Sequence, residues 1–136
     1  MNAVQTPHFA PAVEAFVAAL EGRIDQDVTS FPGLFHQDAV IDVPFDGAGD
    51  ASPIVGRPAI EAMAASLDGF LWFDEVAFDT VRATDDPAVM VCEYEAILRR
   101  ADRDGRLRRR YISIISLREG RISHLREYGG PFMPTR

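Results

Sequence analysis

Two tyrosines and a serine that could orient a substrate lie in segments 89–98 and 109–117, and both segments have the two-residue hydrophobic period of β-strands. Side chains alternate between the two faces of a strand. One predicted face therefore carries Cys92, Tyr94, Ala96, Tyr111, Ser113 and Ile115. A phenol or hydroxyl on such a face can donate a hydrogen bond to a substrate carbonyl as negative charge develops on it, although buried tyrosine is also ordinary core packing.

This arrangement depends on the turn between the two strands. With Asp104-Gly105 at the centre of a two-residue turn, Ser113 pairs with Ala96 and Tyr111 pairs with Leu98. A longer turn would shift the register. The opposite face carries Val91, Glu93, Glu95, Ile112 and Ile114.

The last predicted strand, 121–128, supplies a titratable group. Ser123, Leu125 and Glu127 share one face of it. In an enclosed apolar setting the pKa of this carboxyl would rise, which suits a general acid/base. On an exposed strand Glu127 would instead pair with Arg126, Arg121 or another surface arginine. Both interpretations stay open.

Two further positions are candidate substrate contacts. Ser66 lies in a predicted helix and could orient a ligand, or it could be an ordinary packing serine. Trp72, flanked by Phe70 and Phe73, could form an aromatic wall, with a core or dimer role equally open. The three histidines lack metal-ligand spacing, and no glycine-rich phosphate loop joins a strand to a helix. We therefore expect neither a metal nor a cofactor.

Seven arginines surround the turn between the two strands, and the rest of the chain is acidic. They are Arg99, Arg100, Arg103, Arg106, Arg108, Arg109 and Arg110. The cluster indicates either a solvated hairpin tip or an anion-binding patch. Because the net charge is −7, we expect no nucleic-acid partner.

The elements that must position these residues are helices first and strands later. Helical spacing covers 9–23, 27–36 and 58–68, and strand patterns cover 40–45, 70–84, 89–98, 109–117 and 121–128. The order α-α-β-α-β-β-β-β is typical of an α+β fold, in which long strands curl around the helices as a cone. The 136 residues predict one domain, 1–136. With a single cysteine, no leader pattern and no long apolar stretch, we expect a cytoplasmic protein without membrane contact.

Several motifs, in the same order along the chain, resemble the nuclear transport factor 2-like superfamily, which includes the SnoaL-like cyclases. They are Leu34–Val40 followed by Pro44-Phe45, then Gly56–Ile60, then Glu119–Ile122 with Arg126–Tyr128. Ser66, Thr84–Pro87 and Glu93 are similar to the phenazine-biosynthesis A/B proteins, and ketosteroid isomerase is a more distant relative. This resemblance implies a cone whose inner face carries Tyr94 and Ser113, and whose Glu127 is an acid/base group.

The chain also departs from these families at their functional positions. Val43 and Ser113 stand where ketosteroid isomerase has its base and its buried acid, and Phe16 stands where it has a tyrosine. Ala62 replaces a phenazine-family histidine, and Gly130 replaces a cyclase aspartate. We therefore do not expect a steroid-isomerase mechanism.

The expected function is cofactor-independent acid/base catalysis in secondary metabolism. The reaction would be an isomerisation, cyclisation, dehydration or condensation of a small apolar or aromatic carbonyl compound in an enclosed apolar pocket. Glu127 would move the proton, with Tyr94, Ser113, Ser66 and Tyr111 orienting the substrate, and Phe16, Val43, Trp72 and Leu125 excluding water. The alternatives are a non-catalytic ligand-binding protein and an interaction domain that uses the outer sheet face. Ile112 and Ile114 on that outer face predict a homodimer.

Overall fold

The computed structural model describes residues 7–21, 30–44 and 52–135. Within these ranges there are two α-helices, α1 (Ala10–Leu20) and α2 (Arg57–Leu67), and two 3-10 helices, η1 (Pro7–Phe9) and η2 (Phe31–Leu34). The strands are β1 (Phe35–Asp42), β2 (Ile54–Val55), β3 (Leu71–Ala83), β4 (Val89–Arg100), β5 (Leu107–Arg118), β6 (Arg121–Gly129) and β7 (Met133–Pro134).

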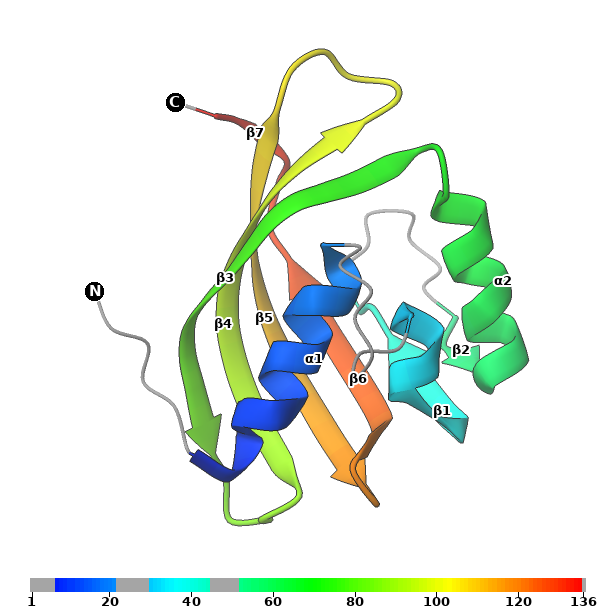
Figure 1. Cartoon of the computed structure of the whole chain (residues 1–136), viewed down its shortest axis with the longest axis vertical. Helices are drawn as coiled ribbons and strands as arrows, with labels where there is room; N and C mark the ends of the chain where they lie inside the picture. Colours follow the sequence, from blue (N-terminus) through cyan, green and yellow to red (C-terminus); the bar gives the residue numbers. More distant parts are fainter. Residues whose placement is uncertain (1–6, 22–29, 45–51, 136) are drawn as a thin grey trace.

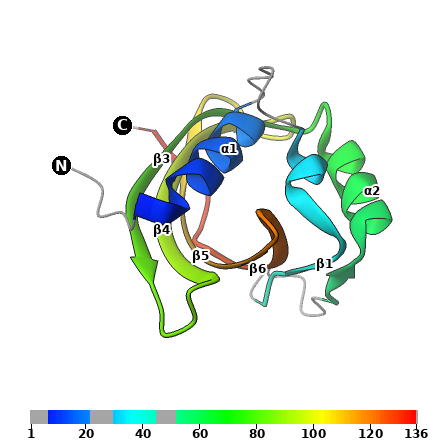
Figure 2. The same ribbon diagram turned by 60° about the horizontal axis from the view of Figure 1, so that its bottom comes forward.

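One mixed sheet curls around helix α1. Its strand order is β2-β1-β6-β5-β4-β3, with β7 paired to β5. β1 and β6 run parallel, and the other pairs are antiparallel. Figures 1 and 2 show α1 lying across the concave face while α2 packs beside β1. The predicted cone-like α+β fold with a curved sheet is therefore confirmed, although the sheet does not close into a barrel.

Helix α1 lies on the concave face because its apolar residues recur every three to four positions. Val13 and Phe16 are 5% and 2% exposed, whereas Glu14 faces solvent. Pro11 lies in the first turn, where a missing amide proton costs no hydrogen bond. Helix α1 thus closes the open side of the sheet with aromatic and aliphatic side chains.

The prediction of a second helix over 27–36 is wrong where the structure describes it; residues 27–29 lie outside the described ranges. Residues 31–34 form only a short 3-10 helix, and Phe35 already begins β1. Pro32 and Gly33 both disfavour continued helix. Phe35 instead is fully buried and pairs with Ile122 of β6, so β1 begins five residues before the predicted 40–45 strand.

The two-residue turn after β4 is also wrong, yet the predicted faces are right. Ser113 pairs with Cys92, four residues from the predicted partner Ala96, because the hairpin is centred between Asp102 and Arg103, two residues before the predicted centre. A displacement by an even number of residues keeps every side chain on its face. The inner face of β4 and β5 is accordingly buried: Cys92, Tyr94, Ala96, Tyr111, Ser113 and Ile115 are at most 5% exposed.

Candidate functional site

Three neighbouring strands bring Glu127, Ser113 and Tyr94 together. Ser113 of β5 pairs with Glu127 of β6 on one side and with Cys92 of β4 on the other. Tyr94 is the next inward-facing residue of β4 after Cys92. The register of three paired strands therefore builds the site.

A chain of hydrogen bonds joins these three side chains. The Tyr94 hydroxyl lies 2.8 Å from Ser113 Oγ and donates to Glu127 Oε1 across a longer 3.5 Å. A phenol has a single proton. When Tyr94 donates to Glu127, the proton between the two hydroxyls must therefore come from Ser113. Both hydroxyls are buried, so each needs this partner.

The half-buried carboxyl of Glu127 has a pKa above its ordinary value. Removal from water is the main cause, and the charge of Arg109 and the hydrogen bond from Tyr94 partly oppose it. Burial also raises the pKa of Tyr94 well above its usual range and that of Tyr111 to about 12. The tyrosines thus remain proton donors while Glu127 can exchange its proton.

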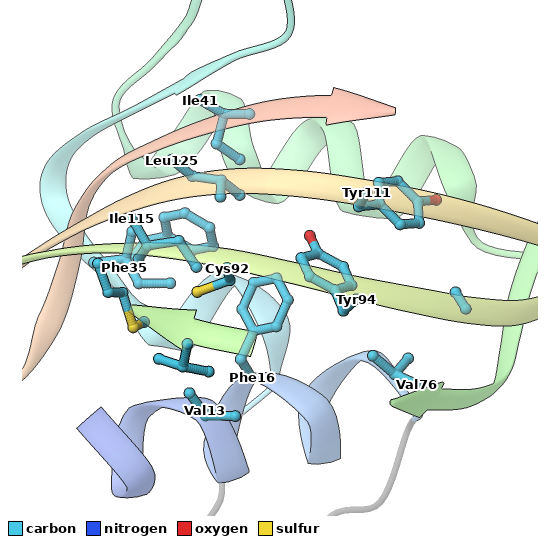
Figure 3. Close-up of a cluster of buried hydrophobic side chains, with 14 of the residues drawn as sticks. Val13, Phe16, Phe35, Ile41, Val76, Cys92, Tyr94, Tyr111, Ile115 and Leu125 are labelled. Carbon is cyan, nitrogen blue, oxygen red and sulfur yellow. The ribbon is translucent and has the colours of Figure 1, made fainter. Parts of the chain in front are cut away.

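Aromatic rings enclose the Tyr94 side chain. Phe78 stacks on it with ring centroids 4.5 Å apart, and Tyr111 stacks at 5.1 Å. Phe16 of α1 meets the ring edge at 5.9 Å. Figure 3 shows Phe16 reaching toward the sheet and the Tyr94 hydroxyl pointing toward β5. These contacts fix the position of the hydroxyl at the centre of the site.

The structure brings several, but not all, of the predicted site residues to this inner face. Phe16, Leu125 and Tyr111 are buried there, and Val43 is half-buried against the same core. Ser66 is exposed on α2, and its hydroxyl donates to the Met63 carbonyl at 2.6 Å. Ser66 therefore lies apart from the Glu127 cluster.

Trp72 also lies apart from the cluster, on the other face of the sheet. It pairs with Arg99, whose guanidinium lies 5.6 Å from the indole centroid, and it is 40% exposed. Its neighbours Leu71 and Phe73 pair with inward-facing residues of β4 instead. Strand alternation therefore turns Trp72 outward.

Arg109 is a component of the site that the sequence analysis did not single out. It pairs with the fully buried Ala96 and lies between Leu107 and Tyr111, which are 2% and 5% exposed. The alternation that places Tyr111 inward also places Arg109 inward. The sequence analysis grouped Arg109 with the arginine cluster and did not apply the strand alternation to it.

A separate pocket of about 180 Å³ lies near the β5–β6 turn. It contains none of the predicted site residues. Its lining is Ala12, Ala15, Gly33, Leu34, Leu117, Gly120, Arg121 and Ile122.

Within 7–21, 30–44 and 52–135, no three histidine, cysteine or acidic side chains are grouped as metal ligands. In the same part of the chain, neither helix has the length and apolar character that crossing a membrane requires.

Comparison with known proteins gives one family and several similar structures. The model of the SnoaL-like domain family matches residues 13–125. A proposed isomerase from Bacillus subtilis has a similar crystal structure, with a TM-score of 0.76 and 24% identity, covering 96% of this chain and 91% of that one. An LEH-like epoxide hydrolase of M. tuberculosis has a TM-score of 0.66 and 24% identity, covering 92% and 84%. A phenazine biosynthesis-related protein from Pseudomonas aeruginosa has a TM-score of 0.59 and 17% identity, covering 89% and 74%.

Proposed function

The chain belongs to the SnoaL-like family, and on this premise we propose that it is a cofactor-independent acid/base enzyme. Its substrate is a small carbonyl-containing metabolite of secondary metabolism, and the reaction is an isomerisation, cyclisation, dehydration or condensation. The hydrogen-bonded chain from Ser113 through Tyr94 to the half-buried Glu127 carries this proposal. Relatives of the same fold that are named as an isomerase and an epoxide hydrolase support a catalytic use of the fold.

In this mechanism Glu127 moves the proton. Its carboxylate removes a proton from the carbon next to the substrate carbonyl and later returns it to another atom. The raised pKa makes the carboxylate a stronger base than a solvated glutamate. Tyr94 stays protonated and donates to the oxygen on which negative charge develops, with Ser113 holding the phenol in place.

Proton transfer of this kind can be tested before the natural substrate is known. We expect the protein to accelerate exchange of α-protons for deuterium in some members of a panel of cyclic and aryl ketones, followed by proton NMR in D2O. A positioned acid/base group contributes roughly 10²–10⁴-fold. Glu127→Gln should lose that factor, and Tyr94→Phe a smaller one.

Glu93→Gln is the matched control, because Glu93 flanks Tyr94 on the opposite face and accepts a hydrogen bond from Thr80. It should keep the wild-type exchange rate. Absence of exchange above the buffer rate on every ketone, or full exchange by Glu127→Gln, would contradict the proposal. A ligand-binding protein without chemistry would then be the better account, because the aromatic inner face suits apolar ligands in either case.

A further inference from the structure

We propose that Arg109 forms an anion subsite beside Glu127 and that the substrate therefore carries a carboxylate on a planar or aromatic body. This inference rests on the proposed function for the location of the chemistry, and it adds the chemical class of the substrate. Four features of the described residues support it: the inward position of Arg109, its fixed geometry, the glycine beneath it and its lack of a carboxylate partner.

The guanidinium is held in a defined orientation. Arg109 Nε donates to the Gly130 carbonyl at 2.7 Å. The guanidinium carbon lies 5.0 Å from the Tyr111 ring centroid and 4.4 Å from that of Phe132. A side-chain hydrogen bond with Arg109 also contributes to the pKa of Tyr111. The terminal amino groups still carry further N–H donors that can bind a carboxylate. The group is thus oriented before any ligand arrives.

Gly129 makes room for this orientation. A Cβ atom at position 129 would lie only 2.5 Å from Arg109 Cζ and 2.8 Å from Nε, closer than real Cβ contacts allow. Gly129 does not have a positive φ, so a larger residue at this position would be opposed by the guanidinium and not by the backbone, and the flexible end of Arg109 would have to move. The guanidinium of Arg109 therefore packs directly against the backbone of Gly129.

Arg109 differs from its neighbours on the strand in its charge partners. Arg108 and Arg110 face outward, and both pair with Glu95. Among the described residues, no carboxylate is in ion-pair contact with Arg109; the charge of Glu127 acts on it only from a distance. A half-buried cation that lacks a direct ion pair is costly. A bound carboxylate would supply that counter-ion.

The surroundings define the shape of the ligand. Tyr111 and Phe132 present aromatic faces to the guanidinium, and Tyr94 continues the stacked row from Tyr111. An aromatic or planar ligand suits this aromatic setting, with its carboxylate on Arg109 and its carbonyl end toward Glu127. An aromatic carboxylate is the simplest probe of this class.

The test uses benzoate as the anion and benzamide as its neutral analogue of similar shape. We expect the wild-type protein to bind benzoate at least about tenfold more tightly than benzamide, as a charge-assisted hydrogen bond implies. Binding is measured by calorimetry and by the NMR shift of the Arg109 Nε–H group. Arg109→Gln should abolish the preference.

Two further variants separate this geometry from general charge effects. Arg108→Gln removes the same charge one residue away on the outer face, and it should keep the preference. Gly129→Ala retains Arg109 but displaces its guanidinium, so it should weaken the preference. Equal affinity for the two compounds, no benzoate binding at tens of millimolar, or the same loss in Arg108→Gln and Arg109→Gln would overturn the anion subsite.

The pH dependence of benzoate binding tests whether the anion subsite lies beside Glu127. A bound carboxylate repels ionised Glu127, so benzoate affinity should fall as the pH rises through the pKa of Glu127 and should be flat in Glu127→Gln. A benzoate preference that is independent of pH in the wild type would overturn the placement beside Glu127. Ketone exchange without benzoate binding refutes only the anion subsite, and benzoate binding without exchange refutes only the acid/base function.

Discussion

Replacement of Tyr94 by phenylalanine removes one oxygen from the centre of the site and leaves the stacked ring in place. The fully buried Ser113 hydroxyl would then lose its partner at 2.8 Å. A buried hydroxyl left without a hydrogen bond costs about 1–3 kcal/mol. We expect Tyr94→Phe to lower the free energy of unfolding by about that amount, which corresponds to roughly 3–6 °C of Tm for each kcal/mol in a domain of this size.

A double-mutant cycle attributes this loss to the hydrogen bond. Ser113→Ala leaves the Tyr94 hydroxyl with Glu127 as an acceptor, so it should cost less, about 1 kcal/mol. The double variant has no orphaned serine hydroxyl. Its loss should therefore be smaller than the sum of the single losses by about 1 kcal/mol. Urea unfolding with an unchanged m-value measures all four proteins.

Two results would refute this reasoning. If Tyr94→Phe is as stable as the wild type, the Ser113 hydroxyl has another partner and the chain to Glu127 does not exist. If the two single losses add without coupling, the hydroxyls do not interact in solution. Either result would remove the structural basis for a positioned Glu127.

Three more predictions follow from burial and exposure. Because the folded-state pKa of Glu127 is raised, its stabilising contribution is full below about pH 4.3 and is lost as the pH rises through the folded-state value. The Tm of Glu127→Gln should therefore fall less than that of the wild type between about pH 4 and pH 8. Equal decreases in Tm would contradict this. Burial raises the pKa of the Cys92 thiol to about 12, so it should react with a disulfide reagent only as fast as the protein unfolds; rapid reaction of the folded protein would show an accessible thiol. We propose that the outer sheet face joins two copies of the chain through Ile112, which is 47% exposed. Light scattering should give the mass of a dimer for the wild type and for the control Val55→Lys, at a 65% exposed position on β2, and the mass of a monomer for Ile112→Lys. A monomeric wild type would refute the proposal.

The faces of the sheet could be predicted from the sequence because hydrophobic alternation survives an error in register. The pairing of Ser113 was misplaced by four residues, yet Tyr94, Tyr111 and Ser113 all face inward as predicted. The position of the turn centre could not be derived, since Asp104-Gly105 fits both the centre of a two-residue turn and the later part of a longer one. Gly105 does adopt a positive φ of 74°.

Irregular features account for the differences that alternation cannot reveal. The register of β3 shifts between Phe73 and Glu75 and again between Phe78 and Thr80. No residue type at these positions predicts a β-bulge. Pro32 is compatible with the first turn of a helix. The parallel pairing of β1 with β6 that replaces the helix is a long-range contact, which the local sequence does not show. Arg109 was grouped with its charged neighbours, although the strand period alone places it inside.

Titration of the Glu127 side-chain carboxyl by carbon NMR tests the central claim most directly, with Glu127→Gln as the assignment control. The account predicts a pKa above the usual value of about 4.3. It also predicts that the pKa rises further in Arg109→Gln and in Tyr94→Phe, because each change removes a group that stabilises the carboxylate. A pKa at or below the ordinary value, unmoved by either substitution, would show that Glu127 is solvated and would contradict its role as the proton-transfer group.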